Sequence, residues 1–217
     1  MRYYLAMIDL GNATPFAQGG NRKCFIHPQD SSKCIKVIDQ ESYSNRLKNL
    51  PWHKKIRGKM SFNDNHEEAK GYQQKSLKNI DQSLWRHVAK YFGSIETNMG
   101  EGLVIELIKN EGEIAGTLED YLFKFGLTEE IKESIHVFEK WLLDNLILTK
   151  NIIPHNLVIK KDDNELVIKI IDGIGSKAFI PLPEYFNFFA KRYVKRRIEL
   201  MWSRINWDLS GRKGDWK

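Results

Sequence analysis

The chain has 217 residues, a formal net charge of +6 and a pI near 9.1, with 41% hydrophobic and 12% aromatic residues. This length suits one medium domain or two small lobes, and the hydrophobic fraction supports a proper core. No stretch resembles a signal peptide or a membrane-spanning helix, so we expect a cytoplasmic protein without a transmembrane segment. The positive charge favours anionic partners, such as nucleotides, nucleic acid or phospholipid, without choosing among them.

The two cysteines, Cys24 and Cys34, form no CxxC motif, and the six histidines do not gather near them at metal-ligand spacing. This pattern argues against a disulfide framework and against a zinc site. We interpret both cysteines as small, buried, apolar residues.

The first half of the chain is predicted to be rich in strands. Residues 33–38 read as a strand with one lysine in an apolar run, and 88–97 and 102–108 read as a hairpin. Helical periodicity is present around 66–72. Between the first strand and this helix, residues 39–65 form a long polar segment for a connector, which indicates mobility or function. It contains a tryptophan among five bases, Trp52 with Lys48, Lys54, Lys55, Arg57 and Lys59.

The second half is predicted to be mostly helical. The Thr and acid spacing of 117–120 is typical of a helix N-terminus, and a longer helix follows from about residue 128. Two apolar runs at 157–159 and 166–171 predict a second hairpin, and the chain ends in an amphipathic helix. The plan is α+β, with an N-terminal antiparallel sheet lobe plus one helix (1–108) and a reduced, mostly helical C-terminal lobe (109–217) in one bilobal domain.

Several residues occur in the order that phosphoryl transfer from ATP requires. A turn containing Gly19 and Gly20 could cover phosphates, and Lys36 is the only charge within its apolar strand. Glu68, on the next helix, could orient that lysine. Taken singly, each has a simpler interpretation: an ordinary turn, a lysine that extends to solvent at an edge, and a solvated helix carboxylate.

Two oxygen-bearing side chains lie at the ends of the predicted C-terminal hairpin. Asn156 follows the loop 149–155 and opens one strand, and Asp172 ends the next strand before two nearby glycines. An amide oxygen and a carboxylate at adjacent strand ends suit Mg²⁺ that is also bound to phosphates. Taken alone, each residue is better explained as a turn residue that satisfies its local backbone. The ordered set of four parts favours the nucleotide interpretation.

The chain resembles the YrbL family, small bacterial proteins named as PhoP regulatory network members and placed in the protein-kinase-like superfamily. The most distinctive part is the Arg-Lys-Cys and His-Pro-x-Asp block of 22–30, followed by 33–37. The resemblance continues up to the final helix, through 68–72, 93–97, 145–149, 154–156 and 172–175.

This resemblance implies a protein-kinase-like fold that binds ATP and Mg²⁺ in a cleft between two lobes. Lys36 would neutralise phosphates with Glu68 as its partner, and Asn156 and Asp172 would be the metal ligands. The segment Glu106-Leu107-Ile108 would be the hinge whose backbone groups meet adenine.

The catalytic loop departs from the kinase pattern. Asn151 stands where kinases usually have the aspartate that receives the proton of the attacking hydroxyl, and an amide cannot take that proton. Ile153 stands where a lysine or histidine is common, and Ala17 replaces the first glycine of the phosphate loop. These residues favour nucleotide binding over efficient transfer by the common route.

Three functions remain open from the sequence. The first is an atypical kinase acting on a protein or small molecule, for which His155 is one conceivable substitute base. The second is a pseudokinase, a nucleotide-responsive regulatory module without turnover. The third is a protein that binds nucleic acid or a membrane surface through the basic loop around Trp52 and the basic side of the last helix. For that helix, a packing face with solvated bases is the simpler interpretation.

Overall fold

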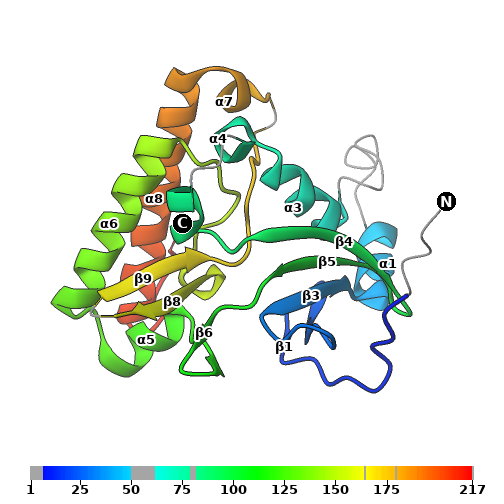
Figure 1. Ribbon diagram of the computed structural model, residues 1–217. Coiled ribbons are helices and arrows are strands. Elements are labelled where there is room, and N and C mark those ends of the chain that lie inside the picture. Colours follow the sequence, from blue (N-terminus) through cyan, green and yellow to red (C-terminus); the bar gives the residue numbers. More distant parts are fainter. Residues whose placement is uncertain (1–6, 50–61, 79–81, 164, 179, 217) are drawn as a thin grey trace. The chain divides into compact units, whose positions relative to one another are not determined.

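The computed structural model describes residues 7–49, 62–78, 82–163, 165–178 and 180–216 (Figure 1). They form two compact units. The first contains the described residues up to Lys70 together with Lys90–Leu107, and the second contains Gly71–Ala89 and Ile108–Lys217. The sequence boundary, expected between residues 108 and 109, differs from this division because 71–89 belongs to the second unit.

The first unit is built on a five-stranded antiparallel sheet with the order β1-β2-β3-β5-β4 (Figure 1). Its strands, in chain order, are β1 (Ala17–Gln18), β2 (Arg22–Ile26), β3 (Lys33–Ile38), β4 (Tyr91–Thr97) and β5 (Gly100–Glu106). The predicted lysine-bearing strand is therefore confirmed as β3, the centre of the sheet. The predicted hairpin is confirmed as β4 and β5.

The two faces of this sheet have different roles. One face is apolar because alternate residues of β2, β3 and β5 pack with the N-terminal segment, and the cluster consists of Ile8, Leu10, Phe25, Ile35, Val37 and Val104. On the opposite face, Cys24 pairs with Lys36 and Lys36 pairs with Leu103, so these three side chains point the same way. Lys36 thus lies on the face opposite this cluster, where buried apolar residues such as Leu103 surround it.

Two helices accompany the sheet. Helix α3 (Asp64–Tyr72) confirms the helical periodicity found around 66–72. Helix α1 (Gln40–Lys48) lies in the segment interpreted as a polar connector, which was wrong for these residues. None of its residues is buried, so the sequence carried no apolar stripe by which to find it. Trp52 and the bases after it lie outside the described residues.

The cysteines differ in burial. Neither forms a disulfide; Cys34 is buried, as expected, but Cys24 is only half-buried, which corrects the prediction for that residue. Burial raises the pKa of the Cys34 thiol to about 12 because the thiolate would lose its hydration.

The second unit is mostly helical. It contains α4 (Lys75–Lys78), α5 (Leu118–Phe125), α6 (Glu129–Asn145), α7 (Leu182–Tyr185) and α8 (Asn187–Leu209) (Figure 1). The predicted N-terminus of α5 is confirmed as a capping box in which Thr117 and Asp120 bond each other's backbone N–H groups. The Thr128 hydroxyl oxygen caps α6 by accepting from the Ile131 N–H.

Strands β8 (Leu157–Asp162) and β9 (Glu165–Ile170) form the predicted C-terminal hairpin, and it packs on α6. A smaller hairpin pairs β6 (Lys109–Asn110) with β7 (Glu113–Ile114), and two 3₁₀ helices span Gln82–Arg86 and Pro154–Asn156. Among the described residues, no helix combines the length and the apolar character needed to cross a bilayer.

A buried histidine lies in the core of the second unit. His87 is 2% exposed, its Nδ1 donates to the Ile168 carbonyl at 2.8 Å, and its ring lies near those of Phe138 and Trp141. Burial in this aromatic environment lowers the pKa of His87 to about 4, because the imidazolium would lose its hydration there. The ring is therefore neutral in the folded protein at neutral pH.

Candidate functional site

Lys36 and Glu68 form a buried ion pair in the first unit. The Lys36 Nζ lies 2.9 Å from Glu68 Oε1, and the two side chains are only 5% and 3% exposed. Strand β3 supplies the lysine and α3 the glutamate, as expected from the sequence. A buried charge is costly unless it is paired, so this contact fixes the ammonium group in a defined position. The interpretations of a surface lysine and of a solvated carboxylate are excluded for this pair.

A third charged residue joins this pair, and the sequence reasoning missed it. Arg22, at the start of β2, donates from Nη1 to Glu68 Oε2 at 2.5 Å and is itself buried. The same Nη1 donates to Asn65 Oδ1 at 3.3 Å, and the Asn65 side-chain amide donates to the Lys36 carbonyl at 2.8 Å. Glu68 is thus a carboxylate shared by two cations. The signal in the sequence was an arginine opening a strand directly after a glycine turn, which alone does not reveal its partner.

The Gly19–Gly20 turn connects β1 to β2. It is closed by a hydrogen bond from the Gly19 N–H to the Arg22 carbonyl at 2.9 Å, and both glycines are exposed. A Cβ atom added at either glycine would meet no atom within 4 Å, and neither backbone is in the left-handed region. The fold of the chain therefore does not itself require glycine at these positions.

The predicted hinge segment Glu106-Leu107-Ile108 uses part of its backbone for internal bonding. The Glu106 N–H donates to the Lys90 carbonyl, the Leu107 N–H donates to the Ser32 carbonyl, and the Ile108 carbonyl accepts from the Ala115 N–H. These three groups are engaged within their own units. An adenine ring bound here would have to use other backbone groups of the segment.

In the second unit, the structure brings Asn151, Asn156 and Asp172 together. The Asn156 side-chain amide donates to the Asn151 carbonyl at 2.9 Å, and the Ile171 N–H donates to the Asn156 carbonyl at 3.0 Å. Asp172 is the next residue along the chain. Because the Asn156 nitrogen is bonded to the loop, its Oδ1 is the side-chain atom that could bind a cation. Asp172, one residue after the Ile171 that bonds Asn156, adds a half-buried carboxylate. Hard oxygen donors of this kind fit Mg²⁺.

The segment after Asp172 fixes the loop that carries Asn151. The Lys150 N–H donates to the Gly173 carbonyl, the Gly175 N–H donates to the Leu148 carbonyl at 2.9 Å, and Thr149 forms a bridge with Ile174. Gly173 has φ +86°, and a Cβ there would lie 2.9 Å from the Asn151 carbonyl oxygen. Glycine is required at this position by both conformation and space.

Two further residues hold the same loop from its other sides. The Gln74 side chain accepts from the Leu148 N–H at 2.7 Å and donates to the Leu148 carbonyl at 3.2 Å. The Tyr193 hydroxyl donates to the Thr149 carbonyl at 3.0 Å from α8. Neither residue was found from the sequence, because a polar residue on a helix gives no indication of a distant backbone partner.

His155, the conceivable substitute base, lies next to a network of charged side chains. Its Nδ1 lies 3.8 Å from Glu119 Oε1, and this carboxylate also binds Arg204 at 3.0 Å and Arg212 at 2.8 Å. Both arginines bind the buried Asp208 as well. This network joins α5 to the end of α8, so a structural role for His155 accounts for its contact.

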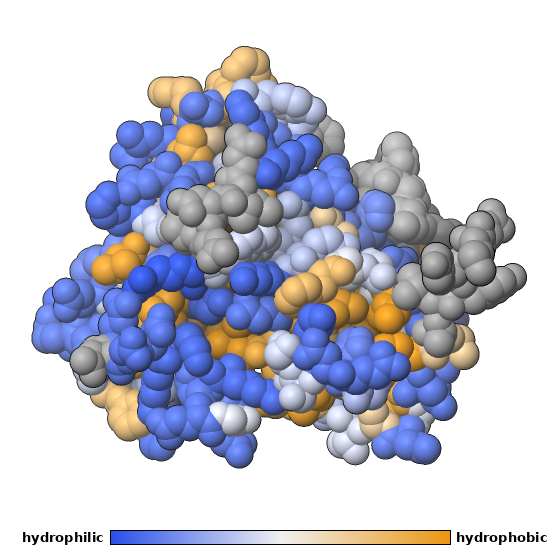
Figure 2. All heavy atoms as spheres, viewed as in Figure 1, coloured by the Kyte–Doolittle hydropathy of each residue, from blue (hydrophilic) through white to orange (hydrophobic). Residues whose placement is uncertain are grey.

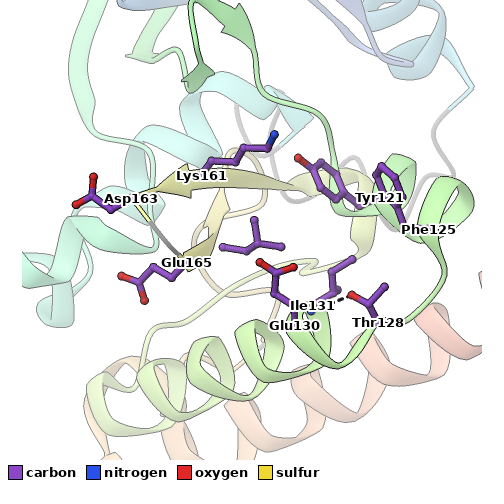
Figure 3. Close-up of a pocket in the computed structure, with 9 residues that line it drawn as sticks. Tyr121, Phe125, Thr128, Glu130, Ile131, Lys161, Asp163 and Glu165 are labelled. Atoms are coloured by element: carbon purple, nitrogen blue, oxygen red, sulfur yellow. Dashed lines mark hydrogen bonds between the residues drawn. The ribbon is translucent and has the colours of Figure 1, made fainter.

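The second unit also contains a cavity of about 450 Å³ between α5, the start of α6 and the tip of the β8–β9 hairpin. Figure 3 shows Tyr121 and Phe125 on one side of it, with Glu130 and Ile131 contributed by α6. None of the residues predicted for nucleotide or metal binding lines this cavity. It is therefore separate from the Asn151, Asn156 and Asp172 set.

The fold is that of a protein kinase domain. The structure superimposes on Rad53 (residues 1–466, in complex with AMP-PNP) with a TM-score of 0.53 and 16% identity, covering 88% of this chain and 45% of that one. It matches a mutant of the Mycobacterium tuberculosis PknI kinase domain with a TM-score of 0.52 and 11% identity, covering 93% of this chain and 75% of that one. At these identities the likeness shows the fold, and it confirms the predicted protein-kinase-like α+β class.

Within that class, the chain belongs to the family described as PhoP regulatory network protein YrbL, whose model matches residues 8–206. It is 27% identical over 204 residues to the YrbL proteins of Escherichia coli (strain K12) and Shigella flexneri, covering 92% of this chain and 86% of each relative. The family resemblance found in the sequence is confirmed.

Proposed function

We propose that this protein binds ATP together with Mg²⁺, with Lys36 and Glu68 as the phosphate-neutralising pair and Asn156 and Asp172 as the metal ligands. The observation that carries the proposal is the buried Lys36–Glu68 ion pair at 2.9 Å. A fold needs no such pair for its own stability, since burying two charges costs about as much as their attraction returns. A fixed ammonium group does suit the neutralisation of phosphate oxygens.

The donor chemistry of the second unit supports the same proposal. Asn156 and Asp172 provide one amide and one carboxylate oxygen, and Mg²⁺ is usually held by one or two carboxylates together with substrate phosphates. The related fold of Rad53 was solved with AMP-PNP, which adds a precedent for a nucleotide on this fold. When bound, the metal would neutralise charge on the phosphates, while Asn156 and Asp172 would orient it.

A calorimetric titration of ATP with Mg²⁺ tests the proposal. We expect saturable binding by the wild type, a loss of affinity in Lys36→Met, and a loss in Asp172→Ala. Asp162→Ala, which removes an exposed carboxylate from β8, is the matched control and should bind like the wild type. Absence of any binding by a folded wild-type sample would refute both nucleotide functions.

Whether the bound nucleotide reacts depends on Asn151. An amide at this position cannot accept the proton of an attacking hydroxyl, which favours a regulatory pseudokinase. Positioning and charge stabilisation supply much of the catalysis of phosphoryl transfer, so an atypical kinase is the second candidate. The acceptor would then be a protein or a small molecule.

Transfer of a radiolabelled γ-phosphate separates the two candidates. For a pseudokinase we expect no label on the protein or on acceptors, with ATP binding intact. Label that is lost in Asp172→Ala but kept in Asn151→Ala would favour the atypical kinase, because transfer would then need the metal ligand and not the residue at the base position.

A further inference from the structure

An exposed cluster of apolar side chains lies where α7 meets α8 in the second unit. Of the fourteen large apolar side chains that are exposed in the described part of the chain, five lie within residues 180–189. We call these the aromatic corner: Ile180, Tyr185, Phe186, Phe188 and Phe189. Burial of α8 begins only at Ala190, so the first turn of the helix projects beyond the core.

Three rings of the aromatic corner, Phe186, Phe188 and Phe189, lie in contact with one another. The centroids of Phe186 and Phe189 are 6.2 Å apart, and those of Phe188 and Phe189 are 5.5 Å apart. Tyr185 is 73% exposed and Phe188 72% exposed, so these rings extend into solvent and do not fold back onto the protein. In Figure 2, light orange side chains lie beside blue ones in the region where Figure 1 shows α7. Exposed apolar patches of this kind mark interaction sites.

Five cations lie near this surface. Lys191, Arg192 and Lys195 follow on α8 at spacings of three to seven residues from Phe188, and all three are exposed. In addition, Lys75 and Lys78 of α4 line a depression of about 260 Å³ together with Tyr185, in which Glu184 is the single carboxylate. We call these five cations the basic collar. In the part of the chain that the structure describes, none of the three α8 cations forms an ion pair with a carboxylate.

We propose that the aromatic corner and its basic collar bind the surface of an anionic phospholipid membrane. Aromatic rings insert at the level of the headgroups, and a ring of lysines and arginines around them is attracted to lipid phosphates. The combination needs no spanning helix. It is independent of the proposed nucleotide binding, because none of the residues proposed for ATP or Mg²⁺ belongs to the aromatic corner or the basic collar.

The charge distribution argues against the other occupants of such a surface. A second copy of this chain would bring its own five cations against the first set, and like charges oppose such an interface. Single-stranded nucleic acid could stack on the rings, but the aliphatic side chain of Ile180 offers no stacking surface, whereas it adds to insertion into lipid.

Vesicle flotation tests the proposal on the full chain. One set of vesicles contains equal parts of phosphatidylglycerol and phosphatidylethanolamine, and the other contains phosphatidylcholine alone. We expect the wild type to float with the anionic vesicles only, and binding to weaken as salt rises. The double variants Phe188→Ser/Phe189→Ser and Lys191→Glu/Arg192→Glu should each lower the bound fraction at least about tenfold.

Matched controls are exposed residues elsewhere in the same unit. Phe123→Ser removes an exposed ring of α5, and Lys213→Glu reverses a cation beyond the end of α8; both should float like the wild type. Equal urea midpoints for all variants would show that folding is unchanged. No flotation of the wild type, or equal flotation with both vesicle types, would overturn the proposal. Two other results would also overturn it. In each, the Phe188→Ser/Phe189→Ser variant still floats with anionic vesicles, but it has lost either a dimerisation or a binding of single-stranded oligonucleotide that the wild type shows.

Discussion

The sharing of Glu68 between Lys36 and Arg22 predicts an asymmetry between two substitutions. Glu68→Gln keeps the shape of the side chain but removes the negative charge that lies 2.9 Å from one buried cation and 2.5 Å from the other. Lys36→Met removes one cation and leaves Glu68 paired with Arg22. Glu68→Gln should therefore destabilise the first unit far more than Lys36→Met does.

The expected magnitude follows from the burial of all three side chains. Removing one member of a buried ion pair costs about 3–5 kcal/mol, because a charge is left in the interior without its partner. For Glu68→Gln, two cations lose the same carboxylate, so the upper part of that range applies. For Lys36→Met, the carboxylate keeps its hydrogen bond to Arg22, and a loss of about 1–2 kcal/mol is expected.

Urea unfolding followed by circular dichroism measures both variants. With a typical slope of about 1–3 kcal/mol per molar urea, Glu68→Gln should lower the midpoint by at least about 1 M. Hydrogen exchange at the amides of β3 tests whether the loss of stability is located in the first unit. Glu101→Gln, which neutralises an exposed glutamate of β5, is the matched control. A Lys36→Met variant as destabilised as Glu68→Gln, or more so, would refute the shared-carboxylate account.

Three other predictions concern single residues. Gly20→Ala should leave stability unchanged but weaken ATP binding, whereas Gly71→Ala should cost about 1–3 kcal/mol in urea unfolding, because its Cβ would lie 2.4 Å from a backbone carbonyl oxygen. The pKa of His87 is lowered to about 4, so between about pH 6.5 and pH 4 only the unfolded chain takes up a proton at this residue. The free energy of unfolding should therefore fall by about 3 kcal/mol as the pH drops through this window. In His87→Gln the fall should be smaller. Iodoacetamide at neutral pH should label Cys24 in the folded protein and leave Cys34, whose pKa is raised to about 12, unlabelled until urea is added. Equal stability of the two glycine variants, a flat pH profile for the wild type, or equal labelling of both thiols would contradict the respective prediction.

The secondary structure was predictable wherever burial left a periodic pattern. The strand around Lys36 and the hairpin after residue 156 alternate or run apolar because they are packed on both sides, and the helix after Thr128 has a buried stripe and a capping residue. Helix α1 has no buried residue, so it left no pattern to find. A helix or strand could therefore be predicted from the sequence where its local propensity and its packing in the fold favour the same structure.

From the sequence, the candidate site was predicted as a set of residues and not as a set of contacts. The order of Lys36, Glu68, Asn156 and Asp172 along the chain, with the family resemblance, led to the nucleotide hypothesis, which stays a prediction. The roles of Arg22 and Gln74 depend on partners 46 and 74 residues away, which no spacing rule reaches without an alignment or a structure. The aromatic corner was not predicted for a different reason. Apolar residues at helical spacing are interpreted as buried core residues, and the sequence alone does not show that their side chains are exposed.

The central claim is that Asn156 and Asp172 hold a metal that the bound nucleotide requires. The most direct measurement is the ATP affinity of the wild type in excess Mg²⁺ and again after chelation with EDTA, with Asp172→Ala measured in parallel. The account predicts that chelation weakens wild-type binding at least about tenfold, and that Asp172→Ala is weak in both conditions. ATP binding that is unchanged by EDTA and by Asp172→Ala would contradict it.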